Sequence, residues 1–116
     1  MAARHAYQRG DVVLVQFPFS SPTGKKDRPA IVLSTNTYHD DWDEILVAAV
    51  TSKPPRKPRT TDCSIHDWTQ AGLHQASWIR AHMATVHRNL ILKKLGNLTV
   101  RDIQSLDDCL RVALGL

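Results

Sequence analysis

Cysteine, aromatic residues and long apolar runs are all scarce in this chain of 116 residues. Its two cysteines, Cys63 and Cys109, form no CxxC pair, so the sequence indicates neither a disulfide framework nor a thiolate metal site and fits a reducing compartment. The longest purely apolar run has six residues, 45–50, whereas a membrane-spanning helix needs about twenty. No apolar signal segment follows the first residues. We therefore predict a cytoplasmic protein without a membrane segment.

The motifs of common cofactor and metal sites are also missing. The sequence contains no GxGxxG or GxxxxGK[ST] loop to cradle phosphates and no GxSxG nucleophile elbow. Its six histidines match no metal-ligand spacing. A chain of this length buries one modest core and leaves little room for an enclosed cofactor. We expect one domain, residues 1–116, with no cofactor and no bound metal.

Charge, in contrast, is present and is segregated by loop. Seven of the fifteen basic residues lie in two segments, 20–28 and 53–61, whereas four acids crowd into 40–44. Cations on two loops can neutralise the phosphates of a nucleic acid, although a solvated basic surface explains the same composition. Aromatic side chains can stack on unpaired bases, or they can fill the core; the candidates are Phe19, Tyr38, Trp42, Trp68 and Trp78.

Hydrophobic periodicity predicts a mainly β protein of the α+β class. Short runs rich in β-branched residues indicate about five strands, at 11–19, 30–35 and 45–52 with weaker candidates at 62–66 and 77–86. Beyond residue 98 the apolar spacing changes to three and four, which predicts an amphipathic helix from about Val100 to Leu114. Thr99 with Asp102 resembles a capping box, and Gly115 stands where helices commonly stop.

A polar strand end and one arginine are the candidates for phosphate chemistry. Thr51, Ser52 and Lys53 follow the apolar run, and Arg28 ends the first basic segment. Hydroxyl, ammonium and guanidinium groups suffice to orient a phosphodiester and stabilise the charge of a displacement. Hydroxyl residues that merely end a strand explain the pattern equally well. Any of the six histidines could exchange protons near neutral pH, but the sequence singles out none.

Three blocks in a fixed order resemble a known family. They are RGDVVLV at 9–15, GKKDRPAIVLS at 24–34 and VAAVTS at 47–52, and further similar blocks continue to the C-terminus. Over about residues 8–116 the chain resembles the PemK/MazF toxins of prokaryotic toxin-antitoxin systems. The resemblance implies a compact five-stranded β-barrel-like sheet with a C-terminal helix, which forms a homodimer. It also implies a metal-independent endoribonuclease that cleaves single-stranded mRNA by 2′-hydroxyl attack and is neutralised by a cognate antitoxin.

The resemblance also assigns site residues. Arg28 and Thr51 fall on the catalytic arginine and threonine of the family, and the residues expected to contact RNA are Phe19, Lys25, Lys26, Ser52, Lys53 and Arg80. The general base is unassigned, with His82 or His87 as candidates if the fold brings one of them near Arg28.

Two alternative functions remain open. One is a family member that binds RNA or an antitoxin without cutting. The other is a CcdB-like toxin that poisons a protein target such as DNA gyrase, against which stands the absence of a tryptophan after Trp78.

Overall fold

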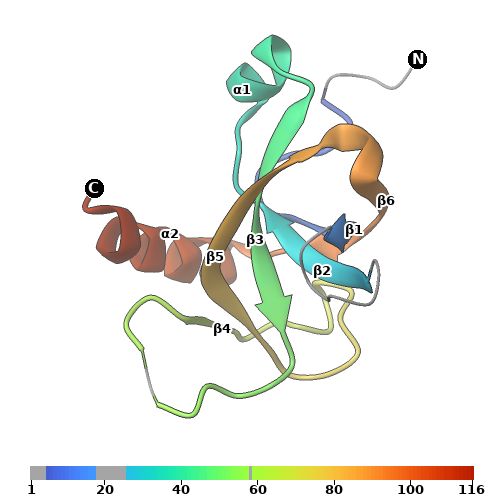
Figure 1. Ribbon diagram of the computed structural model, residues 1–116. Helices are drawn as coiled ribbons and strands as arrows, with labels where there is room; N and C mark the ends of the chain where they lie inside the picture. Colours follow the sequence, from blue (N-terminus) through green and yellow to red (C-terminus); the bar gives the residue numbers. More distant parts are fainter. Residues whose placement is uncertain (1–4, 18–25, 58) are drawn as a thin grey trace.

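The computed structural model describes residues 5–17, 26–57 and 59–116 of the chain (Figure 1). In that part of the chain, the regular elements follow in the order β1 (Asp11–Phe17), β2 (Lys26–Val32), α1 (Asn36–Asp41), β3 (Glu44–Thr51), β4 (Cys63–Ile65), β5 (Ser77–His87), the single-turn 3₁₀ helix η1 (Arg88–Leu90), β6 (Ile91–Asn97) and α2 (Val100–Leu114). The predicted class, mainly β with a C-terminal helix, is confirmed.

The strands form one antiparallel sheet in the order β4-β5-β3-β2-β1-β6. Six described strands replace the five that the sequence predicts, because β6 was not expected. The sheet is strongly curved, as in a partly closed barrel (Figure 1). Its two edge strands, β4 and β6, do not pair with each other, so it is an open sheet. The predicted strand at 11–19 is confirmed from residue 11 to 17, and its last two residues lie outside the described part.

Alternation along the strands divides the buried apolar side chains between two clusters. In β1, Val12 belongs to one cluster and Val13 to the other, as expected for successive residues that point to opposite faces. The first cluster lies between the sheet and α2 and includes Leu106, which is 1% exposed. The second lies on the other face, where Tyr7 and Leu90 pack against it. Both faces of the central strands are therefore buried.

Helix α2 begins and ends where the sequence predicts, but its N-terminus is not closed by a capping box. Thr99 is the N-cap residue without a side-chain bond to the helix backbone, and its hydroxyl donates instead to the Asp67 carboxylate at 2.6 Å. Asp102 accepts hydrogen bonds from the backbone N–H groups of His66 and Asp67, both at 2.9 Å. The helix start is thus joined to the turn after β4. At the other end, Gly115 adopts φ +72 and stops the helix, as predicted.

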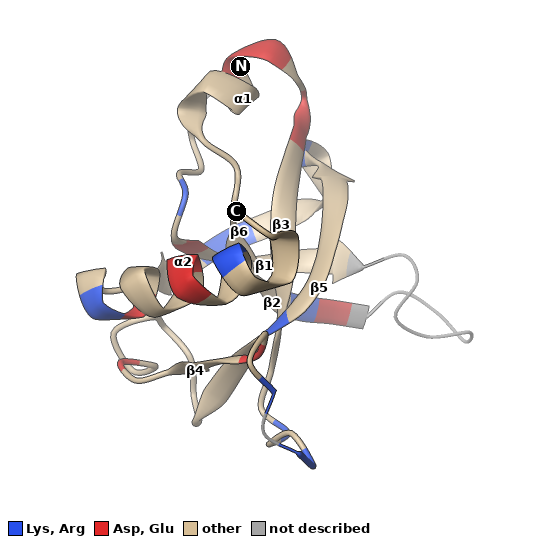
Figure 2. Ribbon diagram, turned by 90° about the vertical axis from the view of Figure 1, so that its left-hand side faces the viewer, with Lys and Arg blue, Asp and Glu red and all other residues tan. Residues whose placement is uncertain are grey.

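The charge segregation seen in the sequence corresponds to opposite ends of the molecule. Acidic residues gather at the end of α1 and the start of β3, whereas the loop that follows β3 carries basic residues at the far end (Figure 2). None of the helices in the described residues is long and apolar enough to span a membrane.

Candidate active site

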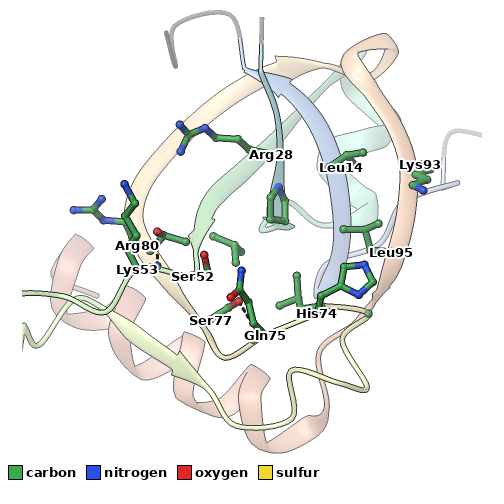
Figure 3. A pocket seen from close by; sticks show the side chains of 15 residues that line it. Leu14, Arg28, Ser52, Lys53, His74, Gln75, Ser77, Arg80, Lys93 and Leu95 are labelled. Carbon is green, nitrogen blue, oxygen red and sulfur yellow. Dashed lines mark hydrogen bonds between the residues drawn. The ribbon is translucent and has the colours of Figure 1, made fainter.

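A pocket of about 640 Å³ opens where β2, β3 and β5 approach the turn at 72–75 (Figure 3). Its apolar lining consists of Leu14, Pro29, Val50, Leu73 and Leu95, of which Val50, Leu73 and Leu95 also belong to the first core cluster or pack against it. Its charged lining consists of Arg28, Lys53, Arg80 and Lys93. No acidic residue lines this pocket in the described part of the chain. A recess with this charge attracts an anion.

Strand register brings Arg28 and Thr51 to the same pocket. In the antiparallel pair of β2 and β3, Ala30 lies opposite Ala49. Arg28 precedes Ala30 by two residues and Thr51 follows Ala49 by two, so both side chains continue the same face at the same end of the pair. The guanidinium Nε of Arg28 is buried and has no hydrogen-bond partner among the described residues. An acceptor oxygen that enters the pocket would relieve this unsatisfied donor.

The chain turns sharply after Thr51, and this turn leaves the hydroxyl hydrogen of the threonine without an acceptor in the described part of the chain. The backbone N–H of Lys53 donates to Thr51 Oγ1 at 3.1 Å. Because the hydroxyl oxygen accepts this bond, its own hydrogen remains free to be donated to a ligand. Ser52 and Lys53 line the pocket on the same side. The polar strand end predicted from the sequence therefore faces the pocket.

A bulge in β5 places Arg80 at the pocket. Between the pairs Ala48–Met83 and Val50–Ile79, one residue of β3 faces three residues of β5, 80–82. Such a bulge redirects the side chains at the extra positions. In Figure 3 the cationic ends of Arg80 and Lys53 lie close together on the side of the pocket where Arg28 also lies. Three cations, from β2, from β5 and from the turn after β3, thus share one rim.

The opposite wall depends on a close contact between two backbones. Gly72 has φ +80, and a Cβ atom placed there would lie 2.1 Å from the carbonyl oxygen of Leu95. Glycine at this position therefore allows the turn to rest directly on β6. The turn carries His74 and Gln75, both pocket-lining residues, on the side away from Arg28 (Figure 3). In the described part of the chain, no group of three or more His, Cys, Asp or Glu residues is arranged to hold a metal ion.

A family model described as PemK-like, MazF-like toxin of type II toxin-antitoxin system matches residues 8–114. The chain belongs to this family. Solved structures with the same fold include a mycobacterial endoribonuclease in complex with its cognate antitoxin, at TM-score 0.78 and 18% identity, with 96% of this chain and 97% of that chain covered.

Two further solved structures share the fold of this PemK/MazF chain. The Mycobacterium tuberculosis toxin MazF-mt6 has TM-score 0.74 and 18% identity, and the match covers 91% of this chain and 97% of that one. MazF from Deinococcus radiodurans has TM-score 0.73 and 21% identity, with 95% and 97% covered. A search of curated protein sequences found no match.

Most of the residues expected from the PemK/MazF resemblance meet in the pocket. Its lining includes Arg28, Thr51, Ser52, Lys53 and Arg80. Phe19 and Lys25 lie outside the described residues, and Lys26 is described only as the first residue of β2.

The histidine that lines the pocket is one that the sequence did not single out. Neither His82 nor His87 is among the lining residues, and the ring of His87 instead accepts a hydrogen bond from the backbone of Asn89 at 3.1 Å. His74 lines the pocket because Gly72 holds its turn against β6. Gly72 was the sequence signal for this turn. It could not reveal that the turn packs on β6, because Leu95 of that strand is more than twenty residues further along the chain.

Proposed function

We propose that this PemK/MazF-family chain is an endoribonuclease toxin that cleaves single-stranded RNA in the pocket beside Arg28 and Thr51. One observation carries the proposal: a pocket whose described lining contains no acid gathers Arg28, Lys53 and Arg80 on one rim beside a threonine hydroxyl whose hydrogen is free. This set suits a phosphodiester, because guanidinium and ammonium groups neutralise the phosphate while the hydroxyl fixes one of its oxygens.

The reaction we propose is an internal displacement at phosphorus. The 2′-hydroxyl oxygen of the RNA attacks the adjacent phosphorus and loses its proton, and the bond from phosphorus to the 5′-oxygen breaks as that oxygen gains a proton. The products are a 2′,3′-cyclic phosphate and a 5′-hydroxyl end. Arg28 stabilises the extra negative charge on the phosphoryl oxygens, and the Thr51 hydroxyl donates to one of them.

The residue that accepts the 2′ proton must be something other than Arg28. A guanidinium has five donors and no acceptor, so it cannot remove a proton. Imidazole is the side chain best suited to this step near neutral pH. Among the described residues, His74 is the histidine that lines the pocket, on the side away from Arg28, and it replaces His82 and His87 as the candidate for an RNA that spans the pocket.

The remaining parts of the proposal concern partners and conditions. We propose that a cognate antitoxin neutralises the protein, by analogy with the mycobacterial endoribonuclease that was solved with its antitoxin. A segment that covers the three cations would have to be acidic. We further propose a homodimer that acts in the cytoplasm without a metal ion, because arginine and threonine supply the charge and hydrogen bonds that a metal would otherwise provide.

Cleavage of a long unstructured RNA in the presence of EDTA tests this proposal. Primer extension should reveal discrete cuts with 5′-hydroxyl ends for the parent. Arg28→Ala should lower the cleavage rate by about 100-fold or more, since one lost transition-state donor has that effect. Arg111→Ala is the matched control, because Arg111 is exposed on α2 and pairs with Asp108. Uncut RNA with folded protein would contradict the proposal and favour a role in binding alone.

A further inference from the structure

A second, smaller cavity of about 210 Å³ adjoins the candidate active site. Three residues, Thr51, Lys53 and Arg80, line both cavities, so the two are neighbours. The smaller cavity lies between β5 and the basic loop that follows β3. Its volume is roughly a third of that of the larger pocket, which suits one flat ring system. A polymer that is held at the larger pocket would therefore place its next unit here.

Trp78 gives this cavity an aromatic surface. In the sheet it lies opposite Thr51 on one side and Ser64 on the other, so all three side chains occupy the same face. The tryptophan is half-buried and lines the smaller cavity but not the larger pocket. Unpaired nucleobases stack on aromatic side chains of this kind. The position is therefore suited to a base rather than to a second phosphate.

Asp62 is the single acid among the described residues that line the two cavities. Its backbone is held from both directions, because its N–H donates to the carbonyl of Arg59 at 3.3 Å and its carbonyl accepts from Cys109 Sγ at 3.7 Å. In the described part of the chain, no residue donates a hydrogen bond to its carboxylate or forms an ion pair with it. A carboxylate without a partner, on a backbone held in this way, can accept two parallel N–H bonds from a ligand.

The cations around Asp62 explain why the cavity still favours RNA. Arg56 and Arg59 join the two shared cations, Lys53 and Arg80, so four cationic residues and one carboxylate line the cavity. The excess of positive charge attracts the phosphates on either side of a bound base. The carboxylate accepts hydrogen bonds from donors on the edge of the base itself. The charge pattern is thus that of a site that reads a base within a chain of phosphates.

We propose that the smaller cavity is a base-reading subsite that binds a guanine next to the scissile phosphate, with Trp78 stacked on its ring and Asp62 accepting its N1–H and N2–H donors. Guanine is the base whose Watson–Crick edge presents two adjacent donors, which matches two carboxylate oxygens. The proposal rests on the RNA cleavage proposed above and names the residues that restrict where the enzyme cuts.

Mapping of cut sites tests the subsite. The parent should cut where guanine occupies one fixed position adjacent to the scissile bond, and replacement of that guanine by inosine, which lacks the N2 amino group, should slow cleavage by about tenfold. Asp62→Asn should reduce this difference between guanine and inosine, since an amide offers a single acceptor oxygen. Asp108→Asn, an exposed acid on α2, is the matched control and should leave it unchanged.

Binding measurements test the tryptophan. In the slowly cleaving Arg28→Ala background, Trp78→Leu should raise the Kd for the cut-site RNA by about tenfold or more, and Trp78→Phe should restore most of the affinity. If Trp78→Leu does not fold, as judged by circular dichroism, the phenylalanine and Asp62 variants carry the test. A parent that cuts RNA without a preference for guanine, or an Asp62→Asn variant with unchanged preference, would overturn the subsite and leave the proposed nuclease intact. A parent that cuts no RNA would overturn both.

Discussion

Replacement of the buried carboxylate at position 102 should destabilise the protein strongly. Asp102 is 0% exposed and accepts hydrogen bonds from the backbone N–H groups of His66 and Asp67. In an Asp102→Ala variant both amides would lose their acceptor inside the protein. A hydrogen bond to a charged group contributes about 1.5–3 kcal/mol, so two such bonds predict a loss of about 4 kcal/mol in the free energy of unfolding.

That loss is large for a domain of this size. Small domains unfold with a total free energy of about 5–15 kcal/mol. With an unfolding entropy of about 2.1 cal/mol/K per residue, a loss of about 4 kcal/mol in a chain of 116 residues lowers Tm by about 15 °C. Urea unfolding followed by far-UV circular dichroism measures the change directly, with Asp102→Asn expected to fall between the parent and the alanine variant because it keeps one acceptor oxygen.

The control for this prediction lies on the same helix. Asp108 is 78% exposed and pairs with Arg111, and surface pairs of this kind contribute about 0–1 kcal/mol. A loss below about 1 kcal/mol for Asp102→Ala, similar to that of Asp108→Ala, would refute the reasoning. Because the turn held by Asp102 leads to the pocket wall at 72–75, the variant should also lose cleavage activity before it unfolds.

Three further predictions use other parts of the fold. Gly72→Ala should cost about 3 kcal/mol, because its Cβ would lie 2.1 Å from the Leu95 carbonyl oxygen at φ +80, whereas Gly115→Ala, with nothing within 4 Å, should cost about 1 kcal/mol; urea unfolding compares them. Burial lowers the pKa of His39 from 6.5. The unfolded chain therefore takes up a proton there before the folded protein does, so stability should fall as the pH decreases below the unfolded pKa of 6.5, and less so in His39→Gln. Burial raises the pKa of Cys63 to about 12, so a thiol reagent at neutral pH should label it only after unfolding.

The sequence predicts elements well where local signals mark both ends. Helix α2 begins after Thr99 and ends at Gly115, and its bounds agree with the prediction. Strand β6 was missed because only Ile91 of its seven residues is buried, so the strand shows no alternation of apolar and polar residues. Helix α1 has six residues, and at its N-terminus the hydroxyl of Thr35 accepts a hydrogen bond from the backbone N–H of Tyr38. A helix of this length is too short to show a hydrophobic period in the sequence.

The site is predictable only in part, for a related reason. Arg28 and Thr51 were assigned through ordered family motifs, and the register of β2 and β3 then accounts for their shared pocket. The positions of His74 and Asp62 in the two cavities depend on contacts between distant segments, such as that of Gly72 with Leu95 and that of Asp62 with Cys109. No local pattern encodes such contacts.

Strand β6 forms one edge of the sheet, and in the described part of the chain it pairs on one side alone, with β1. An edge of this kind invites another molecule to add a strand and begin aggregation. Of the consecutive lysines on that edge, Lys94 pairs with Asp11 at 3.2 Å, whereas Lys93 points to the other face, and two copies of β6 would bring their Lys93 charges together and repel each other. Lys93 also lines the pocket. A neutral substitution of Lys93 would thus have two effects: it would weaken the attraction for phosphate and make concentrated solutions prone to aggregate. Light scattering detects the aggregation separately from any loss of phosphate binding.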